Sequence, residues 1–244
     1  MKTYTLSTIK PASLLLLMAL MGFVAAPSLF AQSFSLGTDL VSRYVWRGAD
    51  FGESASLQPS LAFETKGFEI GTWASYSIAP DGAGANEHDL WISYTIETRR
   101  SGSFSLGATD YYFPAPDGSA FFDFSGSGEG SHWIEPFVRY TGPAVFPVTL
   151  SGAVFVHNDP DHSVYLEAGL PVRIDGVVLG LTAGAVANRS TFYGTDGFAL
   201  VNLGLSATKE IALSEQFSLP VDVAYILNPD QQRSFLVIGF RISL

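Results

Sequence analysis

The stretch Ser33 to Gly48, SFSLGTDLVSRYVWRG, shows a two-sided pattern that recurs along the chain. Successive side chains of a β-strand point to opposite faces, so we read the stretch at a period of two residues. Asp39, Arg43 and Arg47 then share one face. The other face carries Phe34, Leu36, Thr38, Leu40, Ser42, Tyr44 and Trp46. A long strand of this kind suits a wall between lipid and a water-filled lumen.

The composition points the same way. The chain has 244 residues, which is enough for one large domain, and no shift in composition divides it. Charged residues make up 15% and aromatic residues 14% of the chain, as expected when much of the outer surface meets lipid. The absence of cysteine excludes disulfides, thiolate metal sites, cysteine nucleophiles and a lipidated cysteine.

The N-terminus has the features of a secretory signal peptide. Lys2 and Lys10 precede an apolar run from Ser13 to Ala26, and no second long apolar run follows. We expect residues 1–31 to be cleaved after Ala31, leaving residues 32–244 as the barrel domain. Removing both lysines leaves 11 basic against 23 acidic residues and changes the net charge from -10 to -12. So acidic a protein is a poor candidate for binding nucleic acid.

The two-sided pattern recurs along the rest of the chain. Leu90, Ile92 and Tyr94, for example, alternate with Asp89 and Trp91. The predicted strands cover residues 33–48, 57–64, 68–78, 89–97, 103–112, 132–140, 146–156, 164–170, 177–187, 198–207, 217–225 and 233–244. The sequence thus predicts an all-β fold, a closed antiparallel transmembrane barrel of about 12 strands. It must close because lipid offers no hydrogen-bond partner to an edge strand.

Connections between these strands alternate in length. Single-chain bacterial barrels have short periplasmic turns and longer outer loops. We expect the short set at residues 65–67, 99–102, 141–145, 173–176 and 208–214. The longer set is expected at residues 48–56, 79–86, 113–131, 157–162, 188–197 and 227–232. This alternation places both termini on the periplasmic side.

Several short motifs resemble those of one bacterial family. They are Val41–Gly48 (VSRYVWRG), Gln58–Leu61 (QPSL), Gly71–Ser75 (GTWAS), Asn86–Leu90 (NEHDL) and Asp110–Pro114 (DYYFP). In this order they resemble the TorF-like porin family, also called Gcw_chp, of bacterial envelope proteins. The resemblance covers the N-terminal half by motif and the C-terminal half by pattern. It implies an outer-membrane barrel and brings no catalytic residues with it.

Charged residues on the inward face are the candidate site. We expect a lumen lined by Asp39, Arg43, Arg47, Glu69, Asp89, Glu135, Arg139, Glu167, Asp222 and Arg241. These residues either select solutes or form an ion-pair network that stiffens a narrow barrel. Inward acids outnumber inward bases, which predicts a weak preference for cations. Inward Trp73, Trp91 and Trp133 would narrow the lumen.

Two other kinds of site are weaker hypotheses. Some outer-membrane barrels hydrolyse lipid with Ser and His, but Ser131–His132 and His162–Ser163 are adjacent pairs whose side chains point to opposite faces. His157, Asp159, Asp161 and His162 could hold a divalent ion, although such a loop is more often a solvated turn. We therefore expect no catalysis, no cofactor and no metal.

The function that this pattern favours is passive diffusion of small solutes or ions through a polar lumen. The expected location is the bacterial outer membrane. The expected partners are outer-membrane lipid and lipopolysaccharide, the solutes, and the barrel-assembly machinery during biogenesis, with the protein acting as a monomer. The first alternative is a non-conducting structural or adhesive barrel that acts through its outer loops. The second, which the sequence favours less, is a lipid hydrolase.

Overall fold

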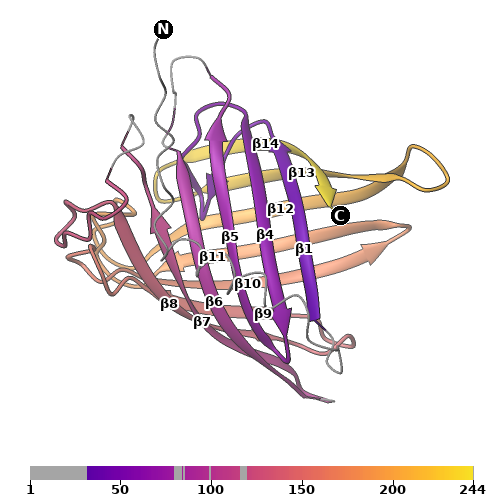
Figure 1. Ribbon diagram of the computed structural model, residues 1–244, viewed down its shortest axis with the longest axis horizontal. Helices are drawn as coiled ribbons and strands as arrows, with labels where there is room; N and C mark the ends of the chain where they lie inside the picture. The colour runs from indigo at the N-terminus through magenta and orange to yellow at the C-terminus, as the bar shows by residue number, and fades with distance from the viewer. Residues whose placement is uncertain (1–31, 80–83, 85, 99, 116–119, 244) are drawn as a thin grey trace, which may run out of the picture.

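Twelve long strands close into one antiparallel barrel in the computed structural model, which describes residues 32–79, 84, 86–98, 100–115 and 120–243 (Figure 1). The predicted fold class is confirmed. The strands are β1 (Gln32–Val41), β4 (Ser56–Thr65), β5 (Phe68–Ser77), β6 (Glu87–Thr98), β7 (Gly102–Tyr112), β8 (His132–Thr141), β9 (Thr149–Val154), β10 (Val164–Ile174), β11 (Val177–Val186), β12 (Ala199–Ala212), β13 (Ser218–Asn228) and β14 (Arg233–Ser243).

The barrel closes where the first long strand meets the last. From β4 to β14 each long strand pairs with the next one along the chain, and β1 pairs with both β4 and β14. Asp39 of β1 lies opposite Gln58 of β4 and Arg241 of β14. Every long strand therefore has a neighbour on both sides, and no edge is left with unpaired backbone groups.

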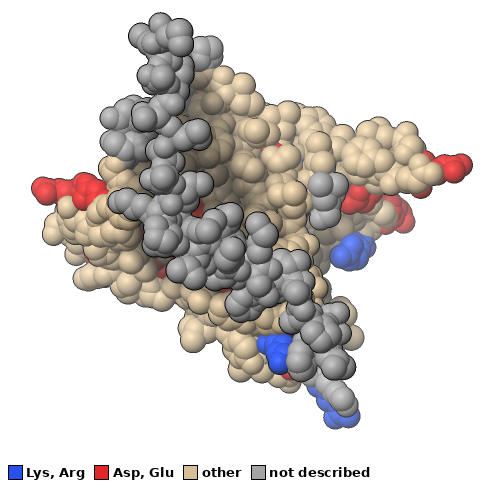
Figure 2. All heavy atoms as spheres, viewed as in Figure 1, with Lys and Arg blue, Asp and Glu red and all other residues tan. Residues whose placement is uncertain are grey.

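The two faces of the wall differ as the period-two pattern requires. Tyr94, Leu106 and Val138 lie side by side on β6, β7 and β8 and are exposed on the outside, at 53%, 63% and 57% of their surface. Ser93 and Ser105, on the opposite face of the same strands, line an internal cavity. Figure 2 shows the outer wall largely free of charged side chains, which gather near the margins of the view. The apolar surface faces outward.

Two hairpin turns at the short-turn end have the geometry that their sequences predict. Lys66–Gly67 joins β4 to β5 and Asp175–Gly176 joins β10 to β11, with positive φ at all four residues. Two-residue turns of this kind match the twist of the flanking strands and favour glycine at the second position. Longer connections lie at the opposite end, among them residues 113–131 and 187–198. The alternation of short turns and long loops is thus present.

The prediction of a single strand from Ser33 to Gly48 is wrong in its second half. β1 ends at Val41, and the chain then forms a separate two-stranded sheet of β2 (Val45–Trp46) and β3 (Ala49–Asp50). Arg47 and Gly48 have φ values of 49° and 78°, so the chain reverses between these two strands. The period of two continues through the hairpin, which is why the pattern alone did not reveal the break.

Smaller differences concern strand ends. β12 continues to Ala212, so most of the turn expected at residues 208–214 is strand. β9 begins at Thr149 rather than at residue 146.

The expected signal peptide, residues 1–31, lies outside the described residues. In the part of the chain that is described, no helix is long and apolar enough to span a membrane.

We expect Gly67→Ala to lower the free energy of unfolding by about 1–3 kcal/mol, because its φ of 80° is unfavourable for a residue with a Cβ. The added Cβ would also collide with the carbonyl oxygen of Thr95. Gly197→Ala is the control, since its Cβ would meet open space at a glycine without positive φ. Denaturant unfolding of the refolded protein measures both, and equal losses would contradict this account of the turn.

Candidate functional site

Residues 44–52, which we call the inner hairpin, fold into the barrel at its long-loop end. The hairpin contains β2, the turn Arg47–Gly48 and β3. Its base is closed by hydrogen bonds from the amides of Phe51 and Gly52 to the carbonyl oxygen of Tyr44. The turn itself lies against the barrel wall, because a Cβ on Gly48 would collide with the carbonyl oxygen of Val201 in β12. Only glycine fits this approach.

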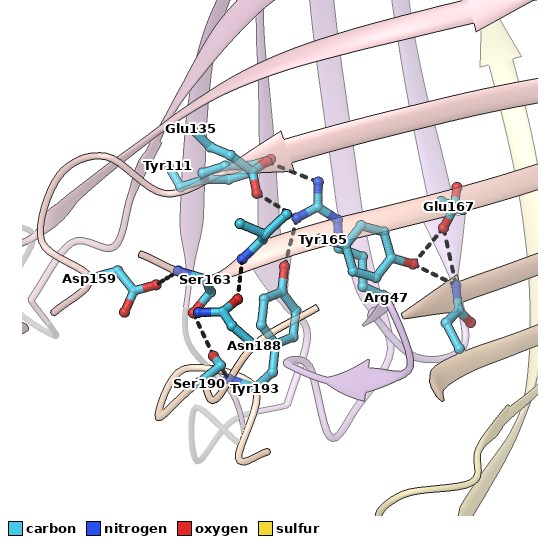
Figure 3. A network of polar contacts seen from close by, with 12 residues as sticks. Arg47, Tyr111, Glu135, Asp159, Ser163, Tyr165, Glu167, Asn188, Ser190 and Tyr193 are labelled. Atoms are coloured by element: carbon cyan, nitrogen blue, oxygen red, sulfur yellow. Dashed lines mark hydrogen bonds and ion pairs between the residues drawn. The ribbon is translucent and has the colours of Figure 1, made fainter. Parts of the chain in front are cut away.

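A buried ion pair anchors the tip of the inner hairpin. Arg47 donates two hydrogen bonds to the Glu135 carboxylate of β8, at 2.6 and 2.9 Å, and a third to the Tyr193 hydroxyl at 2.6 Å (Figure 3). Tyr111 of β7 donates to the same carboxylate at 2.9 Å. The Arg47 and Glu135 side chains are only 15% and 1% exposed. A buried charge needs such partners, so this pair fixes the hairpin in place.

Aromatic rings surround the ion pair. The Arg47 guanidinium carbon lies 4.2 Å from the ring centres of both Trp46 and Tyr165. Trp46 also packs edge-on against Tyr111, with 5.4 Å between ring centres. The cluster at this end of the barrel includes Tyr111, Phe155, Tyr165, Val186, Tyr193, Ala199 and Val201, with Trp46, Phe113, Trp133 and Phe192 packed against it. The rings exclude water from the charged pair and supply cation–π contacts.

The inner hairpin reaches opposite sides of the barrel. The Asn228 side chain of β13 donates a hydrogen bond to the carbonyl oxygen of Gly48 at 3.2 Å. Tyr44, at the other end of the hairpin, hydrogen-bonds Glu87 of β6 and packs 5.2 Å from the Trp73 ring of β5. β6 and β12, which the hairpin touches at Tyr44 and at Gly48, are opposite one another in the ring of twelve strands. The hairpin therefore spans the lumen.

A cavity of about 510 Å³ lies beneath the inner hairpin. Tyr44 and Trp46 of the hairpin line it together with side chains from β5 to β8. The wall residues are Glu69, Trp73, Asp89, Trp91, Ser93, Thr95, Ser105, Thr109, Phe137 and Arg139. Its lining combines aromatic rings, hydroxyls and charged groups in a hollow barrel interior.

The predicted site residues form several separate contacts. Asp39 and Arg241 make an ion pair at 2.9 Å, Arg43 pairs with Asp50 at 2.9 Å, and Arg47 pairs with Glu135. Glu69, Asp89 and Arg139 line the cavity. Glu167 accepts a hydrogen bond from Tyr165 at 2.6 Å, and Asp222 accepts one from Thr208. The prediction that Asp39, Arg43 and Arg47 share one face of a single strand is wrong because β1 ends at Val41, before Arg43.

Sequence reasoning missed the partners of the inner hairpin. Tyr111, Tyr165 and Tyr193 come from β7, β10 and the loop before β12, and no local pattern links them to Arg47. The missed carboxylate is Glu87, two residues before Asp89 on the same face of β6. One signal was available, since Gly48 follows Arg47 between Trp46 and Ala49, and glycine is favoured at the second position of a two-residue hairpin turn.

The histidine and acidic-loop residues have structural contacts. His132 places Nδ1 3.0 Å from Asp110 and Nε2 2.8 Å from the carbonyl oxygen of Phe121, so neither ring nitrogen faces a serine. Asp159 accepts the Ser163 amide at 2.7 Å. Hydrogen bonds from Thr191 lower the pKa of the Asp161 carboxyl. Among the residues described, no group of three or more His, Asp or Glu side chains is arranged to hold a metal ion.

Comparison with known proteins places the sequence in a family. Residues 25–227 match the family described as a bacterial protein of unknown function, Gcw_chp. The chain belongs to the Gcw_chp family. The match includes every strand from β1 to β12 and most of β13, as well as the whole inner hairpin. No curated protein sequence matches this Gcw_chp chain.

We expect Arg47→Ala to lower the free energy of unfolding by about 3–5 kcal/mol, because it leaves the Glu135 carboxylate buried without its cation. Arg241→Ala is the matched control, since it also removes a guanidinium from a carboxylate inside the barrel. Arg241 is 56% and Asp39 26% exposed, so the control should cost about 0–1 kcal/mol. Reversible urea unfolding in micelles measures both. Similar losses for the two variants would mean that burial of the Arg47 pair is unimportant.

Proposed function

We propose that this Gcw_chp protein is an outer-membrane channel of the porin type, through which small solutes and ions diffuse with a weak preference for cations. The observation that carries the proposal is a closed barrel with an apolar outside and a hollow, charged inside. The motifs that resemble TorF-like porins support the same function. The proposal includes residues 1–31 as a cleaved export signal and a monomer as the working unit.

The outer wall supports a place in a membrane. Side chains such as Ile92, Leu106 and Leu236 are at least 48% exposed along the outer face. In water such a surface would favour aggregation, whereas lipid is its matching solvent. Closure also satisfies every edge, as a barrel surrounded by lipid requires. These two features favour a membrane barrel over a water-soluble one.

Charges inside the barrel support a preference for cations. Three carboxylates inside the barrel have a cationic partner, since Asp39 pairs with Arg241, Asp50 with Arg43 and Glu135 with Arg47. Other lumen carboxylates accept hydrogen bonds from neutral donors; they are Glu69, Glu167 and Asp222. Arg139 is the basic residue on the cavity wall. A surplus of negative charge in a confined lumen attracts cations.

In this proposal the inner hairpin is the closed gate of the channel. The hairpin crosses the lumen and is held by one buried ion pair and a hydrogen bond at Gly48. Displacing the hairpin would therefore open the lumen at its long-loop end. The same contacts favour one rival function, a non-conducting barrel that acts through its outer loops. The two functions differ in whether a displaced hairpin leads to conduction.

We expect Ile92→Arg to destabilise the protein in lipid vesicles by about 2–4 kcal/mol, because it places a charge against the hydrocarbon core. Ser93→Arg is the control, since the neighbouring side chain points into the cavity. Equal stability of the two variants in vesicles would contradict a membrane-facing outer wall.

We expect Gly48→Val to raise conductance severalfold over wild type in planar bilayers, because the added side chain cannot fit against Val201. Gly126→Val is the control, since its Cβ meets open space. Reversal potentials in a potassium chloride gradient should show a modest preference for potassium. A Gly48→Val protein that inserts and folds but never conducts would overturn the channel and favour the non-conducting barrel.

A further inference from the structure

The upper part of the cavity, directly beneath the inner hairpin, has features that the channel proposal does not use. Its walls are the rings of Tyr44, Trp73 and Trp91, and the Asp89 carboxylate lies among them. Asp89 lies opposite Trp73 of β5 and Tyr111 of β7, which places it at the hairpin end of β6. Aromatic walls around a carboxylate form a concave site with a defined charge.

The Asp89 carboxylate has an unused acceptor. Its Oδ1 atom is buried and has no hydrogen-bond partner. The side chain also contacts the carboxylate of Glu87, which is 2% exposed. In the described part of the chain neither carboxylate forms an ion pair with Lys or Arg. Two carboxylates in contact cannot both stay ionised without a cation or a proton between them.

Trp91 presents one ring face to the same space. A Cβ on Gly71 would collide with three atoms of the Trp91 ring, so the indole lies flat over this glycine in the wall. The indole nitrogen donates to Glu69 at 2.5 Å, which fixes the ring orientation. Because one face covers the wall and the ring also lines the cavity, the opposite face is available to a ligand. An aromatic face attracts cations, and tryptophan does so most strongly.

The geometry points to a binding site for a small primary ammonium compound, with its ammonium group against the Asp89 carboxylate and its carbon skeleton against Trp91 and Trp73. An ammonium group supplies the two things that Asp89 lacks, a positive charge and an N–H donor. A metal ion fits less well, because the described residues offer too few ligands together. The cavity volume of about 510 Å³ leaves room for an alkyl or aryl chain.

The one basic residue on the cavity wall does not oppose this site. Arg139 lies near the end of β8 at the short-turn side, with its guanidinium carbon 5.7 Å from the Phe137 ring centre. Asp89 lies near the opposite end of β6. Arg139 and Asp89 are therefore separated along the barrel axis. The ammonium group would bind at the hairpin end.

Binding can be tested without a bilayer, so its outcome is independent of the channel proposal. Benzylammonium is titrated into the purified protein in detergent micelles, by calorimetry and by tryptophan fluorescence. Benzyl alcohol, of nearly the same shape but neutral, should bind at least tenfold more weakly. Tetramethylammonium, which has the charge but no N–H donor, should also bind more weakly. Equal affinity for benzylammonium and benzyl alcohol would overturn the proposal.

Variants locate the site within the barrel. Asp89→Asn keeps the shape of the side chain and should weaken benzylammonium binding at least tenfold, while benzyl alcohol binding changes less than twofold. Asp222→Asn is the control, since this carboxylate faces the lumen from β13 and bonds Thr208. Circular dichroism shows whether each variant folds. Gly71→Ala offers a second route, because it displaces the Trp91 ring and leaves every charge in place. Unchanged binding in folded Asp89→Asn and Gly71→Ala would place any bound amine elsewhere.

Discussion

Hydrogen bonding between β1 and β14 is the constraint on which the rest of the structure depends. It turns a row of hairpins into a ring, and it removes the two edges that an open sheet would expose. Once the ring is closed, each strand has one inner and one outer face. The outward side chains can then be largely apolar, as at Leu106 and Val138, while charged side chains such as Asp39 and Arg241 face the lumen.

A hollow ring of this size would leave a wide lumen, and the inner hairpin fills part of it. The hairpin carries a charge into a poorly solvated space, which is unfavourable unless that charge is matched. Glu135 supplies the opposite charge, and the Tyr193 hydroxyl accepts a further hydrogen bond from Arg47. The rings of Trp46 and Tyr165 lie over the guanidinium. The hairpin position is therefore specified by a few directional contacts at Arg47 and by the close approach at Gly48, while the strands supply a general framework.

The sequence was sufficient for the framework and insufficient for the hairpin. Alternation of side chains is a local property, so the faces of β6 and β14 and the Asp175–Gly176 turn could be predicted directly. The break after Val41 could not, because Val45 to Asp50 keeps the period of two inside a different sheet. The partners of Arg47 are side chains 88 and 146 residues away, and no pattern in a single sequence specifies such a distance.

These sequence separations also set an order of assembly. The inner hairpin belongs to the first part of the chain, yet its anchors at Glu135, Tyr193 and Asn228 belong to β8, the loop before β12, and β13. Contacts between distant segments form late, because long loops must first be closed. The hairpin is therefore held in the lumen only after most of the wall has formed. A hairpin bound in this position therefore indicates that the barrel around it is complete.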